Sequence, residues 1–356
     1  YREVVVPDFV ALPKVLLHDH LDGGLRVATV LELADAAGYR NLPVDDPDTL
    51  EAWFHQGDSG SLERYLEAFD HTVAVMQTPE AVERVAYEAG VDLAADGVVY
   101  AEVRFGPCLL TRNGMAYEDS IEAALAGLAR AERDTGLTAP LIVTAMRQMI
   151  DSERVAQAAI RFVGEGVVGF DLAGPEAGYP ADDHLAATRA ARRAGLGLSI
   201  HAGEGDGPNS IWRALDRCCA QRIGHGVRII DDTVQVNGEI DSLGLVATQV
   251  RDQRIPLEVS ISSNLHTGIA ETAAAHPIGP LYRAGFRITL NTDNRLMSSI
   301  ALSDEYRLAH DVLGFTVAEL GLITEAAIEA GFGDYAVRRR LVREVVRPAY
   351  AAVVDS

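Results

Sequence analysis

Two histidines, His18 and His20, stand at the end of an apolar run, residues 15–17, and Asp22 and two glycines follow them. In a β-strand successive side chains point to opposite faces, so the two imidazoles share one face and Asp19 points the other way. Two neighbouring imidazoles at the end of a buried strand make half of a metal site. The alternative is a surface strand with two solvated histidines, which the apolar run before them disfavours.

Three more side chains take the same kind of position, directly after later apolar runs: His201, His225 and Asp293. If these runs are parallel strands of one barrel, their carboxyl ends meet at one face, where catalytic groups gather. Three imidazoles and one carboxylate suit Zn²⁺, which accepts nitrogen and oxygen ligands and leaves a position for water. The ion lowers the pKa of that water to roughly 7, which supplies hydroxide at neutral pH. The pattern therefore predicts a hydrolytic metal site.

Glu204 and His225 are the candidates for proton transfer beside this site. Glu204 follows His201 by three residues, and partial burial raises the pKa of such a carboxyl so that it can donate a proton, whereas a metal lowers it. His225 stands between two glycines and can act as a ligand or as a base that orients the water. The alternatives are a solvated loop glutamate and a core histidine bonded to backbone. We treat the other histidines as ordinary, with His266, just after a strand, as the one to watch: His55, His71, His184, His266, His276 and His310.

Strand and helix patterns alternate along the chain and must position these residues. The expected strands are 15–20, 98–105, 141–145, 167–172, 198–201, 222–225, 257–262 and 287–291. The expected helices are 27–37, 61–69, 79–95, 117–135, 151–164, 181–194 and 210–220. Eight strands alternating with helices predict an α/β fold, a (β/α)8 TIM barrel that fills residues 1–356 as one domain, with extra helices after the first strand and at the C-terminus. The alternative is an open doubly wound sheet, but no Gly-x-Gly-x-x-Gly follows a strand.

The segment between the first two strands has two features of its own. Residues 43–60 are rich in Asp, Pro and Gly and carry Trp53 and Phe54, and we expect a loop or short helix there over the mouth of the site. Further on, Leu62, Tyr65, Leu66 and Phe69 fall on one stripe at helical spacing, which is typical of a helix face packed on the core.

Charge and cysteine usage limit the partners and the compartment. The formal net charge of −21 disfavours nucleic acid and anionic membrane surfaces as partners, because nothing offsets the repulsion. Three cysteines, two of them adjacent, do not form a disulfide framework and favour a reducing compartment. No apolar run has the length of a transmembrane helix and no signal peptide is visible, so we expect a cytoplasmic protein.

The sequence resembles the adenosine deaminase family of zinc amidohydrolases. The matching segments occur in family order and span nearly the whole chain: 12–23 (LPKVLLHDHLDG), 100–107 (YAEVRFGP), 169–176 (GFDLAGPE), 201–204 (HAGE), 222–226 (RIGHG) and 290–293 (LNTD).

The resemblance implies one bound Zn²⁺ and a small purine nucleoside as the substrate. It implies four metal ligands: His18, His20, His201 and Asp293. It also implies that Glu204 shares its proton with purine N1 and that His225 orients the hydroxide that attacks C6. It further implies that His20 contacts the substrate and that Asp22 bonds to the ribose 5′-hydroxyl. The backbone N–H of Gly174 would reach purine N3, and residue 294 would contact N7.

Two residues depart from the family pattern. Asp19 stands where an apolar residue is often found between the first two histidines, and it should face away from the metal. Asn294 stands where the family usually has a second Asp. A carboxylate facing N7 must share a proton with it, whereas an amide donates an N–H directly, so the contact survives and substrate preference can shift.

The expected reaction is the hydrolytic deamination of adenosine and 2′-deoxyadenosine to the inosine forms with release of ammonia. Relatives in the family act on adenine, adenosine monophosphate and 6-aminodeoxyfutalosine; the acidic balance disfavours the monophosphate. Other classes are a barrel kept for binding without catalysis and a metal-dependent hydrolase of esters or lactones. A barrel without catalysis would lack Glu204, His225 or a metal ligand, all of which are present. A hydrolase of esters or lactones does not need a proton donor for a ring nitrogen.

Overall fold

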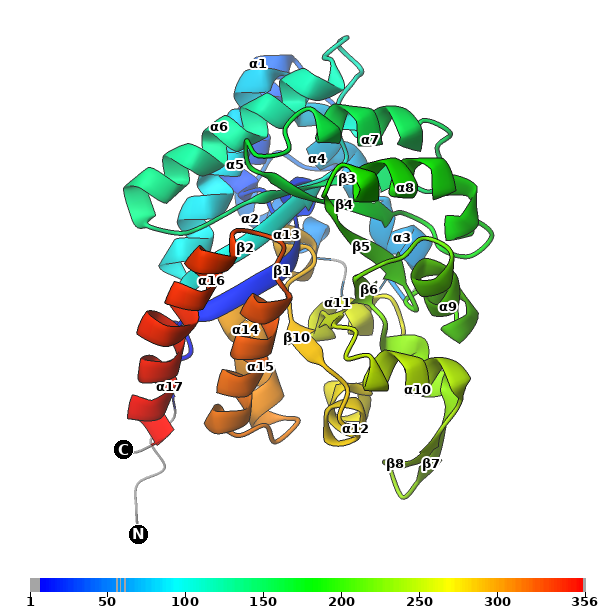
Figure 1. Cartoon of the computed structure of the whole chain (residues 1–356). Coiled ribbons are helices and arrows are strands. Elements are labelled where there is room, and N and C mark those ends of the chain that lie inside the picture. Colours follow the sequence, from blue (N-terminus) through cyan, green and yellow to red (C-terminus); the bar gives the residue numbers. More distant parts are fainter. Residues whose placement is uncertain (1–6, 56, 58, 61, 355–356) are drawn as a thin grey trace.

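Eight parallel strands form a ring in the order in which they occur in the chain (Figure 1). The computed structural model describes residues 7–55, 57, 59–60 and 62–354. The strands are β1 (Lys14–His20), β2 (Val98–Phe105), β3 (Leu141–Met146), β4 (Val167–Ala173), β5 (Gly197–Ala202), β6 (Arg222–His225), β9 (Leu257–Val259) and β10 (Ile288–Leu290). The ring closes where the N–H of His20 donates to the carbonyl of Asp293 at 2.7 Å and the N–H of Asp293 donates to the carbonyl of His18 at 3.0 Å. The predicted (β/α)8 barrel is confirmed.

Helices surround this ring (Figure 1). They are α1 (Val27–Ala37), α2 (Pro47–Phe54), α3 (Leu62–Leu66), α4 (Phe69–Val75), α5 (Pro79–Ala95), α6 (Tyr117–Thr135), α7 (Ser152–Ile160), α8 (Leu185–Arg193), α9 (Pro208–Asp216), α10 (Leu245–Asp252), α11 (Ile261–His266), α12 (Ile278–Arg283), α13 (Arg295–Ser298), α14 (Leu302–Asp311), α15 (Val317–Ala330), α16 (Tyr335–Leu341) and α17 (Arg347–Val354). A π-helical segment, Val342–Val346, joins α16 to α17. The extra helices lie where we expected them, after β1 and at the C-terminus.

Capping residues, prolines and glycines mark where the helices begin and end. The side chain of Thr78 accepts the N–H of Ala81 and Pro79 occupies the first turn, so α5 begins there. Gly136 takes a left-handed φ of 79° and ends α6. The barrel strands are buried along almost their whole length, since parallel strands are covered on both faces, and this explains their nearly continuous apolar sequences.

The structure differs from the expected elements in three places. The strand predicted at 257–262 ends at Val259, because the carboxylate of Glu305 accepts the N–H groups of Ile261 and Ser262 and α11 begins there. The helix predicted at 61–69 is divided into α3 and α4, and Ser61 lies outside the described residues. A hairpin that we did not predict, β7 (Thr233–Val236) and β8 (Glu239–Leu243), extends away from the barrel (Figure 1).

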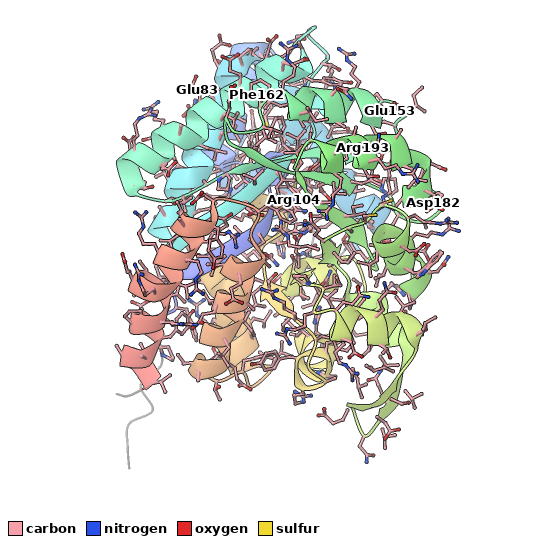
Figure 2. The ribbon with its side chains drawn as sticks, viewed as in Figure 1. Glu83, Arg104, Glu153, Phe162, Asp182 and Arg193 are labelled. Carbon is pink, nitrogen blue, oxygen red and sulfur yellow. The ribbon has the colours of Figure 1, made fainter. Side chains whose placement is uncertain are left out.

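The barrel interior contains charged side chains as well as apolar ones. Figure 2 shows Arg104 in the middle of the molecule, whereas Glu153 and Arg193 lie on the outer helices. Arg104 is fully buried, as are Asp171 on β4 and Glu258 on β9. The three cysteines are free thiols. None of the described helices combines the length and the apolar character that crossing a bilayer requires.

Candidate metal centre

Four of the side chains picked out in the sequence meet at the carboxyl ends of β1, β5 and β10. His18 Nε2 lies 3.2 Å from Asp293 Oδ1. His20 Nε2 lies 3.2 Å from His201 Nε2 and 3.5 Å from Asp293 Oδ1. His225 is the fifth member of the cluster, with its ring centroid 4.9 Å from that of His18. One ligand atom from each of His18, His201, His225 and Asp293 falls within 4.8 Å of the others.

The hydrogen bonds of two of these histidines leave a lone pair free for a metal. His18 Nδ1 lies 3.0 Å from Glu258 Oε2, and His201 Nδ1 lies 3.0 Å from Asp171 Oδ1. An ionised carboxylate only accepts hydrogen bonds, so each Nδ1 carries a proton and each Nε2 presents its lone pair to the site. His18 Nε2 is buried and has no hydrogen-bond partner among the described residues. Buried polar atoms are rarely left in this state, and a metal ion fits the donor set.

Two arginines keep the supporting carboxylates ionised. Burial opposes the ionisation of Glu258, but Arg104 and Arg222 outweigh it and hold its pKa well below the usual range. Burial likewise opposes the ionisation of Asp171, and the charges of His201 and Arg104 hold its pKa low. Sequence reasoning gave these residues no role. Their signal was available, because a charged residue inside an apolar strand must have a buried partner.

His225, the last residue of β6, and Asp293, three residues after β10, both take a left-handed conformation with φ of 59°. A left-handed conformation costs a residue other than glycine roughly 1–2 kcal/mol, and such strain persists where the surrounding structure imposes it. Packing is equally tight at Gly224, where a Cβ atom would lie 3.1 Å from His18 Cε1. A side chain at position 224 would therefore press on the ring of His18 and the backbone of His201.

Glu204 is buried in the turn after β5, and its Oε2 lies 3.5 Å from His225 Nε2. Burial raises the pKa of this carboxyl well above its usual value, and the charges of Asp293 and Glu176 raise it further. These effects favour the protonated form of the carboxyl. Glu176 also fixes the turn, because its carboxylate accepts the backbone N–H groups of residues 203 to 206. Glu176 belongs to one of the family-like segments, but the sequence alone assigned it no role.

A cavity of about 370 Å³ opens onto these groups. Asp22, Gly174 and Asn294 line it, together with His20, His201, Glu204, His225 and Asp293. Burial raises the pKa of Asp22 to about 7, and Asp22 Oδ1 and Asn294 Oδ1 have no partner among the described residues. Asp19 faces away from the cavity, as expected, and accepts hydrogen bonds from Thr292 and Arg295.

The cover of the cavity comes from a different segment than we expected. The described residues of 43–60 do not line it; part of this segment forms α2, where Trp53 packs on Phe54 and His71. The apolar stripe on α3 and α4 lines the cavity instead: Leu62, Tyr65, Leu66 and Phe69. Helical spacing correctly predicted a shared face, but it does not distinguish a face on the core from a face on a binding site.

His276, which we treated as ordinary from the sequence, lies behind His225. It is buried and lies 3.3 Å from Asn264 Oδ1 through its Nε2, and Asn264 Nδ2 lies 3.0 Å from His225 Nδ1. His276 precedes α12 and is far from the strand ends in sequence, so no local pattern connects it with the site.

Buried lone pairs arranged for a metal, a buried carboxyl with a raised pKa beside them and a cavity of small-molecule size suit metal-assisted hydrolysis. A family model described as adenosine deaminase matches residues 13–348. An adenosine deaminase from Mycobacterium ulcerans is 49% identical over 350 residues, which cover 96% of each chain. The fold is shared with an adenine deaminase from Arthrobacter aurescens, 26% identical with a TM-score of 0.85 over 97% of this chain and 100% of that one. It is also shared with an amidohydrolase from Burkholderia ambifaria solved with bound Zn, 25% identical with a TM-score of 0.86 over 99% and 96% of the two chains. The chain therefore belongs to the adenosine deaminase family of metal-dependent hydrolases.

Proposed function

We propose that this protein hydrolyses adenosine and 2′-deoxyadenosine to the corresponding inosine forms and ammonia, with one Zn²⁺ bound by His18, His20, His201 and Asp293. The observation that carries the proposal is the position of Glu204. A buried carboxyl whose pKa is raised by burial faces the same cavity as a set of imidazole and carboxylate lone pairs. This pairing suits attack by hydroxide on a ring carbon next to a ring nitrogen, because the nitrogen must gain a proton as the carbon is attacked.

Glu204 is the proton donor in this scheme. Its carboxyl gives a proton to purine N1, which makes C6 electrophilic. A bound Zn²⁺ supplies hydroxide at neutral pH by lowering the pKa of a water to roughly 7. His225, whose Nε2 is 3.5 Å from Glu204 Oε2, orients the attacking hydroxide and stabilises its negative charge.

The remaining polar groups of the cavity hold the nucleoside. Asp22 accepts the ribose 5′-hydroxyl, the N–H of Gly174 reaches purine N3, and the amide of Asn294 donates to N7. An acidic group at the 5′ position repels a phosphate there, so a nucleoside is favoured over its monophosphate. Apolar side chains of α3 and α4, those of Leu62, Tyr65, Leu66 and Phe69, cover the base.

A side-by-side ultraviolet assay tests the proposal. Purified protein is given adenosine, 2′-deoxyadenosine, adenine, adenosine monophosphate and 6-aminodeoxyfutalosine, with and without a chelator. We expect rapid, chelator-sensitive conversion of the first two. If zinc-loaded protein turned over adenine or 6-aminodeoxyfutalosine faster than adenosine, the substrate assignment would be wrong. If it turned over none of the five, the deaminase assignment itself would fail.

A further inference from the structure

A chain of hydrogen bonds behind His225 starts from a donor whose direction is fixed. The backbone N–H of Ile278 donates to His276 Nδ1 at 3.2 Å, so this nitrogen must carry a lone pair. Burial lowers the pKa of His276 to about 3, and the ring is neutral. A neutral imidazole with a lone pair on Nδ1 carries its proton on Nε2.

The polarity of this first bond determines the next two. His276 Nε2 donates to Asn264 Oδ1 at 3.3 Å, which sets the orientation of the Asn264 amide. The amide nitrogen then faces His225 Nδ1 at 3.0 Å and donates to it. His225 Nδ1 is therefore an acceptor, and the proton of the neutral ring is on Nε2, the nitrogen that faces Glu204. All three side chains are buried, so water does not compete for these bonds.

His225 thus has the opposite polarity to its neighbours. Carboxylates behind His18 and His201 place the protons of those rings on Nδ1 and turn lone pairs toward the site. An amide donor behind His225 places its proton on Nε2 and turns an N–H toward the site. A nitrogen that carries a proton cannot bind a metal, so the hydrogen bonds separate His225 from the ligands even though it lies among them.

We propose that Asn264 and His276 are positioning residues, which hold neutral His225 in the tautomer that donates an N–H toward the oxygen attacking the substrate. The inference rests on the proposed deaminase function. In the resting enzyme, His225 Nε2 is then a hydrogen-bond donor. It is neither a metal ligand nor a proton acceptor. Neither of the two positioning residues lines the substrate cavity.

The tautomer is measured directly by ¹⁵N NMR of histidine-labelled protein, since protonated and unprotonated imidazole nitrogens have widely separated shifts. Spectra are recorded for the native protein with and without Zn²⁺, and His225→Gln identifies the resonances of His225. We expect an unprotonated Nδ1 and a protonated Nε2 in both samples. A protonated Nδ1 in the native protein overturns the proposal. This result does not depend on turnover, so it is separate from any failure of the deaminase assay.

Paired variants test the effect on catalysis. His276→Gln keeps an acceptor for Ile278 and a donor for Asn264, so its kcat should stay within about threefold of native. His276→Met and Asn264→Leu remove the donors. Both should lower kcat by about 100-fold, with native zinc content and little change in KM. His310→Gln is the control, because His310 Nδ1 hydrogen-bonds to the carbonyl of Phe315, away from the site. Native kcat in His276→Met and Asn264→Leu, or equal losses in His276→Gln and His276→Met, would overturn the proposal.

Discussion

The carboxylate of Glu176 holds the backbone of Glu204 in place. Glu176 Oε2 accepts the N–H of Glu204 at 3.0 Å and those of Gly205 and Asp206 at 2.7 and 3.1 Å, while Oε1 accepts the N–H of Gly203 at 2.7 Å. Four successive N–H groups form a concave anion site, and here a buried side chain of the protein occupies it. The anion site of this glycine-rich turn is therefore occupied by a carboxylate from the loop after β4.

Glu176→Gln should weaken both the turn and catalysis. An amide has one acceptor oxygen, and its NH₂ group would face N–H donors that are left without partners, at a cost of about 1–3 kcal/mol in the free energy of unfolding. Glu204 loses its position at the same time, so we expect kcat to fall at least about tenfold. Urea denaturation and steady-state kinetics measure the two effects. Glu325→Gln is the control, since its pair with Arg347 lies at the surface and contributes little to stability. Native kcat in Glu176→Gln would contradict this role.

Glu204→Gln should keep the fold and the metal but lose most of the turnover. The amide has nearly the same shape as the protonated carboxyl and cannot deliver a proton to N1, and proton transfer of this kind contributes about 10²–10⁴-fold to a rate. Metal analysis, thermal unfolding and the adenosine assay together check the prediction. A fully active Glu204→Gln protein would show that the proton comes from another group.

The barrel and the convergence of its polar strand ends could be predicted because they depend on local patterns. Apolar runs define the strands, and a polar residue directly after each run marks the shared face, so His18, His201 and Asp293 could be placed together from the sequence alone. The supporting residues could not be assigned in this way. Glu176, Asn264 and His276 act through contacts between segments far apart in the chain, and nothing in their local sequence distinguishes them from ordinary loop and core residues.

Local patterns also could not predict which segment lines the cavity. The periodicity of residues 62–69 predicts that their apolar side chains share one face. Whether that face meets the core or an open cavity depends on segments far away in the chain. Tyr65, for example, is almost fully buried, yet its hydroxyl lies 3.2 Å from Ser298 Oγ and its ring lines the cavity. A buried side chain can therefore pack in the core and line a binding cavity at the same time.

Asp171→Asn should lower metal affinity without unfolding the protein. Asp171 fixes the proton of His201 on Nδ1, and an amide at this position can instead donate to Nδ1 and turn an N–H toward the metal site. Loss of such a supporting carboxylate typically costs about 10–100-fold in metal affinity. Competition with a chromogenic chelator measures the change. Asp182→Asn is the control, since Asp182 pairs with Arg213 outside the site. Equal zinc affinity in native and Asp171→Asn protein would show that Asp171 does not set the tautomer.

The carboxyl of Glu305 should make stability fall between mildly acidic and neutral pH. Burial raises its pKa from 4.5 to about 7, although hydrogen bonds from Ser262 and Ile261 favour the ionised form. Between these two pH values the folded protein holds a proton that the unfolded chain has lost, so the free energy of unfolding decreases as pH rises, by about 3 kcal/mol in all, and levels off above pH 7. The difference in unfolding free energy between native and Glu305→Gln protein, measured in urea across this window, should change by that amount. A pH-independent difference would contradict the prediction.

Asn294 should make recognition of purine N7 independent of pH. Its amide donates an N–H whatever the pH, whereas a carboxyl at this position donates only while it is protonated. Gly23 packs so closely on this side chain that a Cβ atom there would lie 2.1 Å from Asn294 Oδ1, so the amide has little freedom to move. With 7-deazaadenosine the N–H loses its acceptor, and kcat/KM should fall about 10- to 100-fold relative to adenosine, in line with a buried donor left unpaired. In Asn294→Asp the preference for adenosine over 7-deazaadenosine should shrink as pH rises, because the carboxyl loses its proton, while the native ratio stays constant. A native ratio near one would mean that Asn294 does not contact N7, and a constant ratio in Asn294→Asp would mean that the contact does not depend on a donated proton.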